Sequence, residues 1–269
     1  MNTHKEGIIH YCDKRSLVIY LPTSNTKQII TLDQEIYELA DSISHQGKIY
    51  IIGGKNDGRV LGETCIVDLK KKTLIPKEKM LCPKYEHALC ALKLFIYSVG
   101  GADLSRAFDD CEKYNIKNNS WSQLPALKYS RCYNAAFIFN YSVIYTFGGW
   151  SQNESNAILL EKLSIKNAIE WENVNVKNAP TMRNEIHGIQ IGKNQILLFG
   201  SYQSSKECFL IDIKDDVLSF KKSFELQVGG HFHWCPAPIL NGQYVYGVDE
   251  EHMIHICNLR TMKWRAIDK

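Results

Sequence analysis

The stretch Leu94-Phe95-Ile96-Tyr97-Ser98-Val99-Gly100-Gly101 returns in altered form as Val143-Ile144-Tyr145-Thr146-Phe147-Gly148-Gly149. Both copies are apolar runs that end in a glycine doublet. Between the two copies stand Tyr114, Trp121 and Arg131, in that order. An apolar strand written twice, with aromatic residues at set places after it, predicts a fold built from similar consecutive units.

Further copies of the doublet lie on both sides of this stretch. Ile49-Tyr50-Ile51-Ile52-Gly53-Gly54 is a complete copy, whereas Gly200-Ser201 and Gly247-Val248 end weaker ones. The first glycines stand at positions 53, 100, 148, 200 and 247, so the interval is 47 to 52 residues. A period of this length, filled with short apolar runs, predicts that each unit is a small antiparallel sheet.

Each unit divides into four strands, which we designate a to d in chain order. A short turn joins strands a and b in every unit, for example Gln46-Gly47, Asn140-Tyr141 and Asn241-Gly242. Asparagine and glycine suit such turns because they accept positive φ. Four-stranded sheets that repeat at this period build an all-β fold, the β-propeller, in which the sheets surround a central channel.

The N-terminal stretch has no glycine doublet, but it still contains three strand-like runs. We assign residues 8–11, 17–21 and 28–32 to strands b, c and d of a first blade, which would then lack strand a. This assignment predicts one propeller domain over residues 1–269, with six blades of which the first is three-stranded. A five-bladed ring with an N-terminal extension is the alternative.

The order of an apolar strand, Gly-Gly, Tyr, Trp and Arg resembles the kelch repeat. Gly100-Gly101, Tyr114, Trp121 and Arg131 match it best, and Gly148-Gly149, Trp171 and Arg183 follow. The pattern covers nearly the whole chain, with Leu74 and Leu218 in two of the Trp positions. The resemblance implies a protein-interaction scaffold without catalytic activity. Its partner would be another protein, such as a cytoskeletal component or a substrate or adaptor of a ubiquitin ligase.

Composition and charge are those of an ordinary globular protein. The formal net charge is +3, and the basic residues are scattered apart from Lys70-Lys71-Lys72, a run typical of a solvated turn. We therefore expect neither nucleic acid nor a membrane as partner. The nine cysteines include no C-x-x-C pair, and no apolar signal segment follows Met1. These features favour reduced thiols and a cytoplasmic location, and the resemblance adds a link to the cytoskeleton.

The loops between strands d and a, and between b and c, gather on one end of a propeller, and in kelch proteins this end often holds the partner. Arg, Tyr and Trp residues of these loops are the side chains from which interface hot spots are commonly made. The candidate partner-binding residues are Arg59, Tyr85, Arg106, Arg131, Trp150, Arg183, His231 and Trp234. For Arg131 and Arg183, a structural role in the repeat is the open alternative.

Nothing in the sequence singles out a catalytic set, a cofactor or a metal site. His231 and His233 near Cys235 have the alternation of a strand, but no further ligands accompany them. We therefore expect no enzyme activity, no cofactor and no metal. A structural subunit docked in a large cytoskeletal or ciliary assembly, and a sugar-modifying enzyme related to kelch proteins, remain the alternative functions.

Overall fold

The computed structural model describes residues 8–11, 14–22, 24–151, 160–174, 176–177, 186–200, 207–214, 217–225, 237–249 and 253–267. In these residues the protein is an all-β propeller with four-stranded antiparallel blades. No helix in the described part has the length and apolar character needed to cross a membrane.

The sheets follow one another in chain order. The first contains β1 (Ile8–Tyr11), β2 (Ser16–Leu21) and β3 (Thr26–Thr31). The second contains β4 (Asp41–His45), β5 (Lys48–Ile52), β8 (Thr64–Asp68) and β9 (Thr73–Pro76), and its b–c loop carries the hairpin of β6 (Lys55–Asn56) and β7 (Arg59–Val60). The third contains β10 (Ala88–Leu92), β11 (Phe95–Val99), β12 (Cys111–Asn115) and β13 (Ser120–Gln123).

The remaining three sheets complete the ring. The fourth contains β14 (Ala135–Phe139), β15 (Val143–Phe147), β16 (Leu160–Ser164) and β17 (Glu172–Asn173). The fifth contains β18 (Val176–Lys177), β19 (His187–Gly192), β20 (Gln195–Phe199), β21 (Glu207–Lys214) and β22 (Val217–Glu225). The sixth contains β23 (Ile239–Asn241), β24 (Tyr244–Val248), β25 (Ile254–Asn258) and β26 (Lys263–Ile267).

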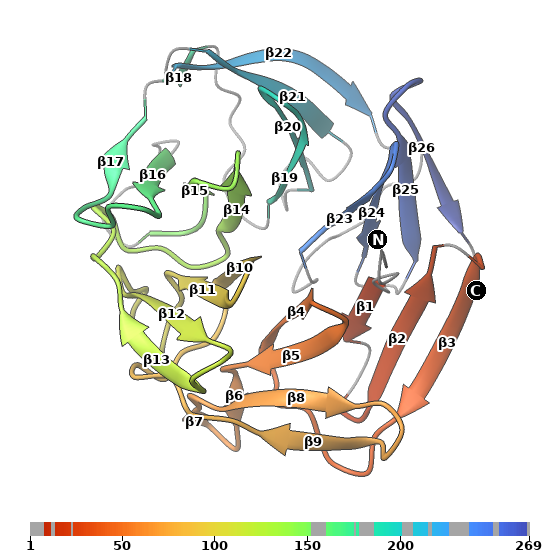
Figure 1. Ribbon diagram of the computed structural model, residues 1–269, viewed down its shortest axis with the longest axis vertical. Coiled ribbons are helices and arrows are strands. Elements are labelled where there is room, and N and C mark those ends of the chain that lie inside the picture. The colour runs from red at the N-terminus through yellow and green to blue at the C-terminus, as the bar shows by residue number, and fades with distance from the viewer. Residues whose placement is uncertain are drawn as a thin grey trace.

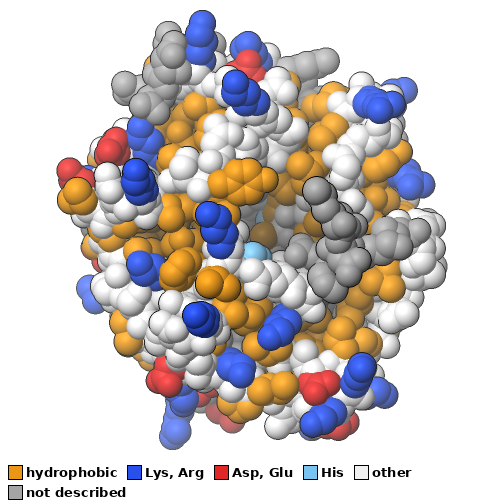
Figure 2. All heavy atoms as spheres, in the orientation of Figure 1, with side chains coloured by type: hydrophobic (Ala, Val, Ile, Leu, Met, Phe, Trp, Pro, Cys, Tyr) orange, Lys and Arg blue, Asp and Glu red, His pale blue; other side chains and the backbone are white. Residues whose placement is uncertain are grey.

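The sheets stand around a central opening, with β1, β4, β10, β14, β19 and β23 innermost (Figure 1). Figure 2 shows one end of this ring, which is hollowed at its centre, with Lys and Arg side chains around the hollow. In the described residues, five sheets have four or more strands. The propeller therefore has five blades of four or more strands and not six blades, because the first sheet, expected as a three-stranded sixth blade, is not a complete blade and fills the remaining place in the ring.

Two strand assignments need correction. The N-terminal strands take positions a, b and c, not b, c and d, because β1 lies innermost beside β4 and β3 lies at the outside (Figure 1). The missing strand is therefore the outer strand d. The fifth sheet also departs from four strands, because β18 pairs in parallel with β22 through Val176 and Leu218.

Pairing within the sheets follows the predicted repeat. Tyr114 lies directly opposite Trp121 across β12 and β13, with ring centroids 5.2 Å apart, and Cys257 lies opposite Trp264 in the same way. The turn between β14 and β15 has positive φ at Asn140 and Tyr141. Two consecutive residues with positive φ give a turn whose twist matches that of the strands.

Apolar side chains fill the gaps between neighbouring sheets, because alternate residues of each strand point to opposite faces. In the third sheet, Ile96 and Tyr114 face the second sheet, whereas Tyr97 and Val99 face the fourth. A cluster that includes Tyr20, Tyr246 and Val248 joins the first sheet to the last. The rings of Tyr20 and Tyr246 lie 5.8 Å apart, so apolar contact closes the propeller.

The doublets Gly53-Gly54 and Gly100-Gly101 allow the second and third sheets to approach the loops that lead into the sheets after them. Gly100 and Gly101 have φ values of 66° and 116°, and the N–H of Gly101 donates to the Arg131 carbonyl at 2.8 Å. A Cβ atom on Gly100 would lie 2.5 Å from the same carbonyl oxygen. Both the positive φ and the close backbone contact therefore require glycine.

We expect Gly100→Ala to lower the free energy of unfolding by about 3 kcal/mol or more, because the strain of positive φ adds to a backbone clash. Gly47→Ala is the matched control, since Gly47 has φ of 70° but a Cβ there would meet no atom within 4 Å. The control should lose only about 1 kcal/mol. Urea unfolding of wild type and the two variants measures the free energies. Equal losses in the two variants would contradict the close contact between Gly100 and the Arg131 carbonyl.

Candidate functional site

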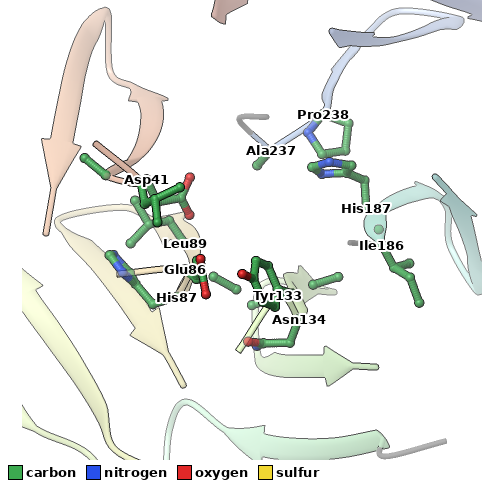
Figure 3. A pocket seen from close by; sticks show the side chains of 16 residues that line it. Asp41, Glu86, His87, Leu89, Tyr133, Asn134, Ile186, His187, Ala237 and Pro238 are labelled. Atoms are coloured by element: carbon green, nitrogen blue, oxygen red, sulfur yellow. The ribbon is translucent and has the colours of Figure 1, made fainter. Parts of the chain in front are cut away.

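The d–a and b–c loops share one end of the ring, which we call the loop face. A pocket at its centre, the channel mouth, is formed where the innermost strands begin. Its lining comes from the second to the sixth sheets and comprises Leu39, Ala40, Asp41, Glu86, His87, Ala88, Leu89, Tyr133, Asn134, Ala135, Ala136, Ile186, His187, Gly188, Ala237 and Pro238. Figure 3 shows Asp41, Glu86 and Tyr133 converging on this mouth, while the His87 ring turns away from them.

Three consecutive d–a loops place a left-handed residue at the same position. Leu39, Glu86 and Tyr133 have φ values of 55°, 55° and 58°. The N–H of Tyr133 donates to the Glu86 carbonyl at 3.0 Å, and the N–H of Glu86 points to the Leu39 carbonyl at 3.5 Å. A chain of backbone contacts thus runs from blade to blade around the channel mouth and holds these side chains there.

Burial changes the acid–base properties of two groups in the channel wall. It raises the pKa of the Asp41 carboxyl to about 7, although the N–H of Ser42 donates to that carboxyl at 2.7 Å. Burial, together with the nearby Lys84 ammonium, lowers the pKa of His87 to about 3. The imidazole of His87 is therefore neutral at pH 7, which agrees with two buried ring nitrogens that have no described hydrogen-bond partner.

Buried ion pairs connect two of the d–a loops to the blades that follow them. The Arg131 side chain is fully buried, and its Nη2 donates to Glu161 Oε1 at 2.5 Å while Nη1 donates to the Gly148 carbonyl at 3.1 Å. Lys84 stands at the same place in the preceding loop and is also fully buried, with Nζ 2.5 Å from Asp110 and 3.4 Å from Glu112. These contacts make both cations part of the loop framework.

The buried glutamates also bind loop backbone. Glu112 accepts from the N–H groups of Leu81 and Cys82 at 2.7 and 3.1 Å, and Glu161 accepts from that of Lys128 at 2.6 Å. Each glutamate thus pairs with one buried cation and accepts hydrogen bonds from the backbone N–H groups that precede that cation in the chain. A buried charge needs such pairing and hydrogen bonding to be tolerated.

Three of the predicted binding residues meet in a second pocket, the loop-face cleft, of about 350 Å³. Its lining comprises Tyr85, Glu86, Ala102, Asp103, Leu104, Ser105, Arg106, Cys132, Tyr133 and Trp150. The Tyr85 hydroxyl donates to the Asp103 carbonyl at 2.9 Å, and the exposed Arg106 guanidinium lies 5.5 Å from the Phe108 ring centroid. Trp150 is 43% exposed.

The Asp103 side chain shapes the wall of this cleft. Its Oδ1 accepts from the N–H groups of Ser105 and Arg106 at 2.7 and 2.9 Å and from the Ser105 hydroxyl at 2.7 Å. Hydrogen bonds from Ser105 lower the pKa of Asp103. Leu104, at the tip of the turn, is 64% exposed and adds apolar surface beside Trp150 in the cleft.

The other predicted residues are not part of this cleft. Arg59 is exposed on β7, in the hairpin of the second sheet. Arg131 is inside the loop framework, so its guanidinium is not at the surface. Arg183, His231 and Trp234 lie outside the described residues.

Sequence reasoning missed Glu86 and Tyr133 as surface groups. Tyr133 precedes β14 and lines both the channel mouth and the cleft, and Glu86 lines both as well. Leu39, Glu86 and Tyr133 each stand two residues before the first residue of an innermost strand, which is Asp41, Ala88 or Ala135. That alignment has no chemical signature, because the three residues share a backbone conformation and not a side-chain type.

No group of three or more potential metal-ligating side chains occurs in the part of the chain that the structure describes. The pair His231 and His233, with Cys235, falls outside that part.

The repeated antiparallel sheets around a central opening define the protein as a β-propeller. Residues 15–201 match the family model described as KLHDC2/KLHL20/DRC7 Kelch-repeats domain. The match covers more than half of the chain, and the chain therefore belongs to this family of kelch-repeat domains. Such domains generally serve as protein-interaction modules and are typically non-catalytic. No curated protein matches the chain.

We expect Glu161→Gln to lower the free energy of unfolding by about 3 kcal/mol or more, because it leaves the Arg131 charge buried without a compensating carboxylate. Glu170→Gln is the control, since Glu170 pairs with Lys128 on the surface and both side chains are largely exposed. Loss of the Glu170 carboxylate should change the free energy of unfolding only slightly. Urea unfolding provides the measurement, and similar stability of the two variants would contradict a structural role for the Arg131 pair.

Asp41 should make stability depend on pH. Its folded-state pKa of about 7 lies above the ordinary value of 3.8, so its protonated form favours the folded state. This stabilisation is complete below about pH 4 and is lost as the pH rises through 7. The difference in unfolding free energy between wild type and Asp41→Asn should thus fall over this window, by less than about 4 kcal/mol. Urea titrations at several pH values measure it, and a flat difference would contradict the burial of this carboxyl.

Proposed function

We propose that this chain is a non-catalytic interaction module that binds a partner protein through its loop face, with the loop-face cleft as the centre of contact. The observation that carries the proposal is the convergence of Tyr85, Arg106 and Trp150 in one cleft. These residues come from three separate loops and are far apart in the sequence. Hot spots are enriched in the same three residue types.

The physical state of these side chains supports the proposal. The Tyr85 ring is held by its hydrogen bond to Asp103 and lies 5.8 Å below the Lys55 ammonium. The Arg106 guanidinium rests over the Phe108 ring, so less entropy is lost when a partner binds it. Preordered aromatic and basic side chains on a rigid scaffold suit recognition of a protein surface.

Arg131 has a different role in this proposal. Because it is buried against Glu161, it holds the loop that carries Cys132 and Tyr133 and does not touch the partner. Replacement of Arg131 would therefore weaken binding only through loss of the loop. The partner-facing role belongs to Tyr85, Arg106 and Trp150, with exposed Arg59 as a second basic group on the same face.

We expect the double variant Arg106→Ala/Trp150→Ala to lose at least about tenfold of the affinity for a stoichiometric partner captured from native lysate. The matched control is Ile29→Ala/Lys70→Ala, which removes one exposed apolar and one exposed basic side chain away from the loop face. Circular dichroism and thermal melting must first show that both variants fold. Quantitative pull-down measures partner loss.

Two outcomes would contradict the proposal. If the partner is retained by the cleft variant, the cleft is not the contact. If the control variant loses the partner to the same extent, binding depends on general surface properties. Loss confined to the cleft variant supports the loop face as the binding surface.

A further inference from the structure

The opposite end of the ring carries an apolar pocket that the proposed function does not use. It lies between the third and fourth sheets, has a volume of about 350 Å³, and opens where the a–b and c–d turns gather. Leu92 and Phe95 line it from the third sheet, and Ile165 and Ala168 from the fourth. All four are partly exposed. We call it the turn-end pocket.

The preceding gap in the propeller shows why this pocket exists. Between the second and third sheets, the Tyr114 ring fills the corresponding place, 6.4 Å from the Tyr50 ring, and its hydroxyl donates to Asn119 at 2.6 Å. In the fourth sheet the residue at the Tyr114 position is Leu163, opposite Ile144 in the same register. Leu163 lines the turn-end pocket together with Ala168. Tyr97 of the third sheet also lines this gap, but Leu163 cannot supply the ring and the hydrogen bond to an asparagine that Tyr114 supplies in the preceding gap.

The rim of the turn-end pocket is basic. Lys93, Lys113 and Lys166 line it, and its lining contains no Asp or Glu. The Lys113 ammonium lies 5.6 Å from the Phe95 ring centroid, at the edge of the apolar surface. No salt bridge of these three lysines occurs within the described residues. The pocket therefore offers a positive potential that is complementary to an anionic partner.

An exposed aromatic side chain completes the surface. Tyr141, at the tip of the turn between β14 and β15, is 80% exposed and lines the same pocket. Its backbone is fixed in the left-handed region with φ of 56°. An exposed tyrosine on a rigid turn next to an apolar pocket loses little entropy on binding, which favours a role as an anchor.

We propose that the turn-end pocket docks an acidic peptide segment of a partner protein, with an aromatic side chain of that segment inserted between the third and fourth sheets. The Tyr114 ring in the preceding gap is the internal template for the aromatic group. The three lysines supply positive charge for carboxylates on either side of the aromatic residue of the peptide. This site is separate from the loop face, so the module would hold two protein segments at opposite ends of the ring.

The test uses methyl NMR of the full chain, because shifts of Leu92, Ile144 and Ile165 report occupancy of the pocket even when binding is weak. The probes are the peptides acetyl-Glu-Glu-Tyr-Glu-Glu-amide, the same peptide with Ala in place of Tyr, and acetyl-Lys-Lys-Tyr-Lys-Lys-amide. We expect saturable shifts at these methyl groups with the acidic tyrosine peptide only. Raising the salt concentration should weaken this binding.

Two variants separate the apolar and charged parts of the site. Ala168→Leu places extra carbon atoms at the rim of the pocket and should abolish the shifts. The triple variant Lys93→Gln/Lys113→Gln/Lys166→Gln should weaken binding about tenfold. The matched control replaces Lys70, Lys71 and Lys72 by Gln, an equal change in net charge on an exposed turn of the second sheet, and should bind as wild type does.

Each result decides for or against the proposal. Shifts that are equal for the acidic and basic peptides, that survive Ala168→Leu, or that occur at Leu104 on the loop face in place of the pocket would overturn it. Absence of shifts at millimolar peptide, with all proteins folded, would do so as well. Because Leu104 reports the cleft separately, failure here leaves the proposed function of the loop face standing.

Discussion

The described part of the propeller depends on close contact between two glycine doublets, Gly53-Gly54 and Gly100-Gly101, and the loops that enter the third and fourth blades. The N–H of Gly54 donates to the Lys84 carbonyl at 3.0 Å, and that of Gly101 donates to the Arg131 carbonyl at 2.8 Å. The residues that supply these carbonyls are the same ones whose buried cations pair with Glu112 and Glu161. Each loop is therefore fixed twice, by its backbone to the previous blade and by its side chain to its own blade. Tyr85 and Cys132, which line the loop-face cleft, directly follow these two anchored residues.

Much of the fold follows from local patterns in the sequence. The doublets mark the ends of strand b, and the a–b turns carry residues that accept positive φ. Tyr114 and Trp121, which are part of the repeat pattern, lie on adjacent strands of one sheet. Leu74 and Leu218, in the positions of the repeat tryptophans, are both buried, as expected for apolar residues in those places. These features are determined by neighbours within one blade, so one repeat contains enough information to predict them.

Features that depend on several blades were harder to predict. The first three strands could be b, c and d or a, b and c, because apolar alternation is the same in both, and only the packing of β1 beside β4 decides it. For Arg131, the repeat pattern is equally consistent with exposure and burial. Its partner Glu161 lies 30 residues away on β16, and nothing in the local sequence marks that glutamate as buried. The cleft of Tyr85, Arg106 and Trp150 was predicted as residues on one face, but its shape required the structure.

The shared left-handed conformation of Leu39, Glu86 and Tyr133 has a consequence for how such a surface can change over time. The backbone at these positions is held by the neighbouring blades, whereas the side chains are apolar, acidic and aromatic in turn. The backbone conformation at these positions thus does not depend on the type of side chain. Substitutions at these three sites would therefore change the chemistry that the channel mouth presents, while the backbone contacts between the blades stay in place.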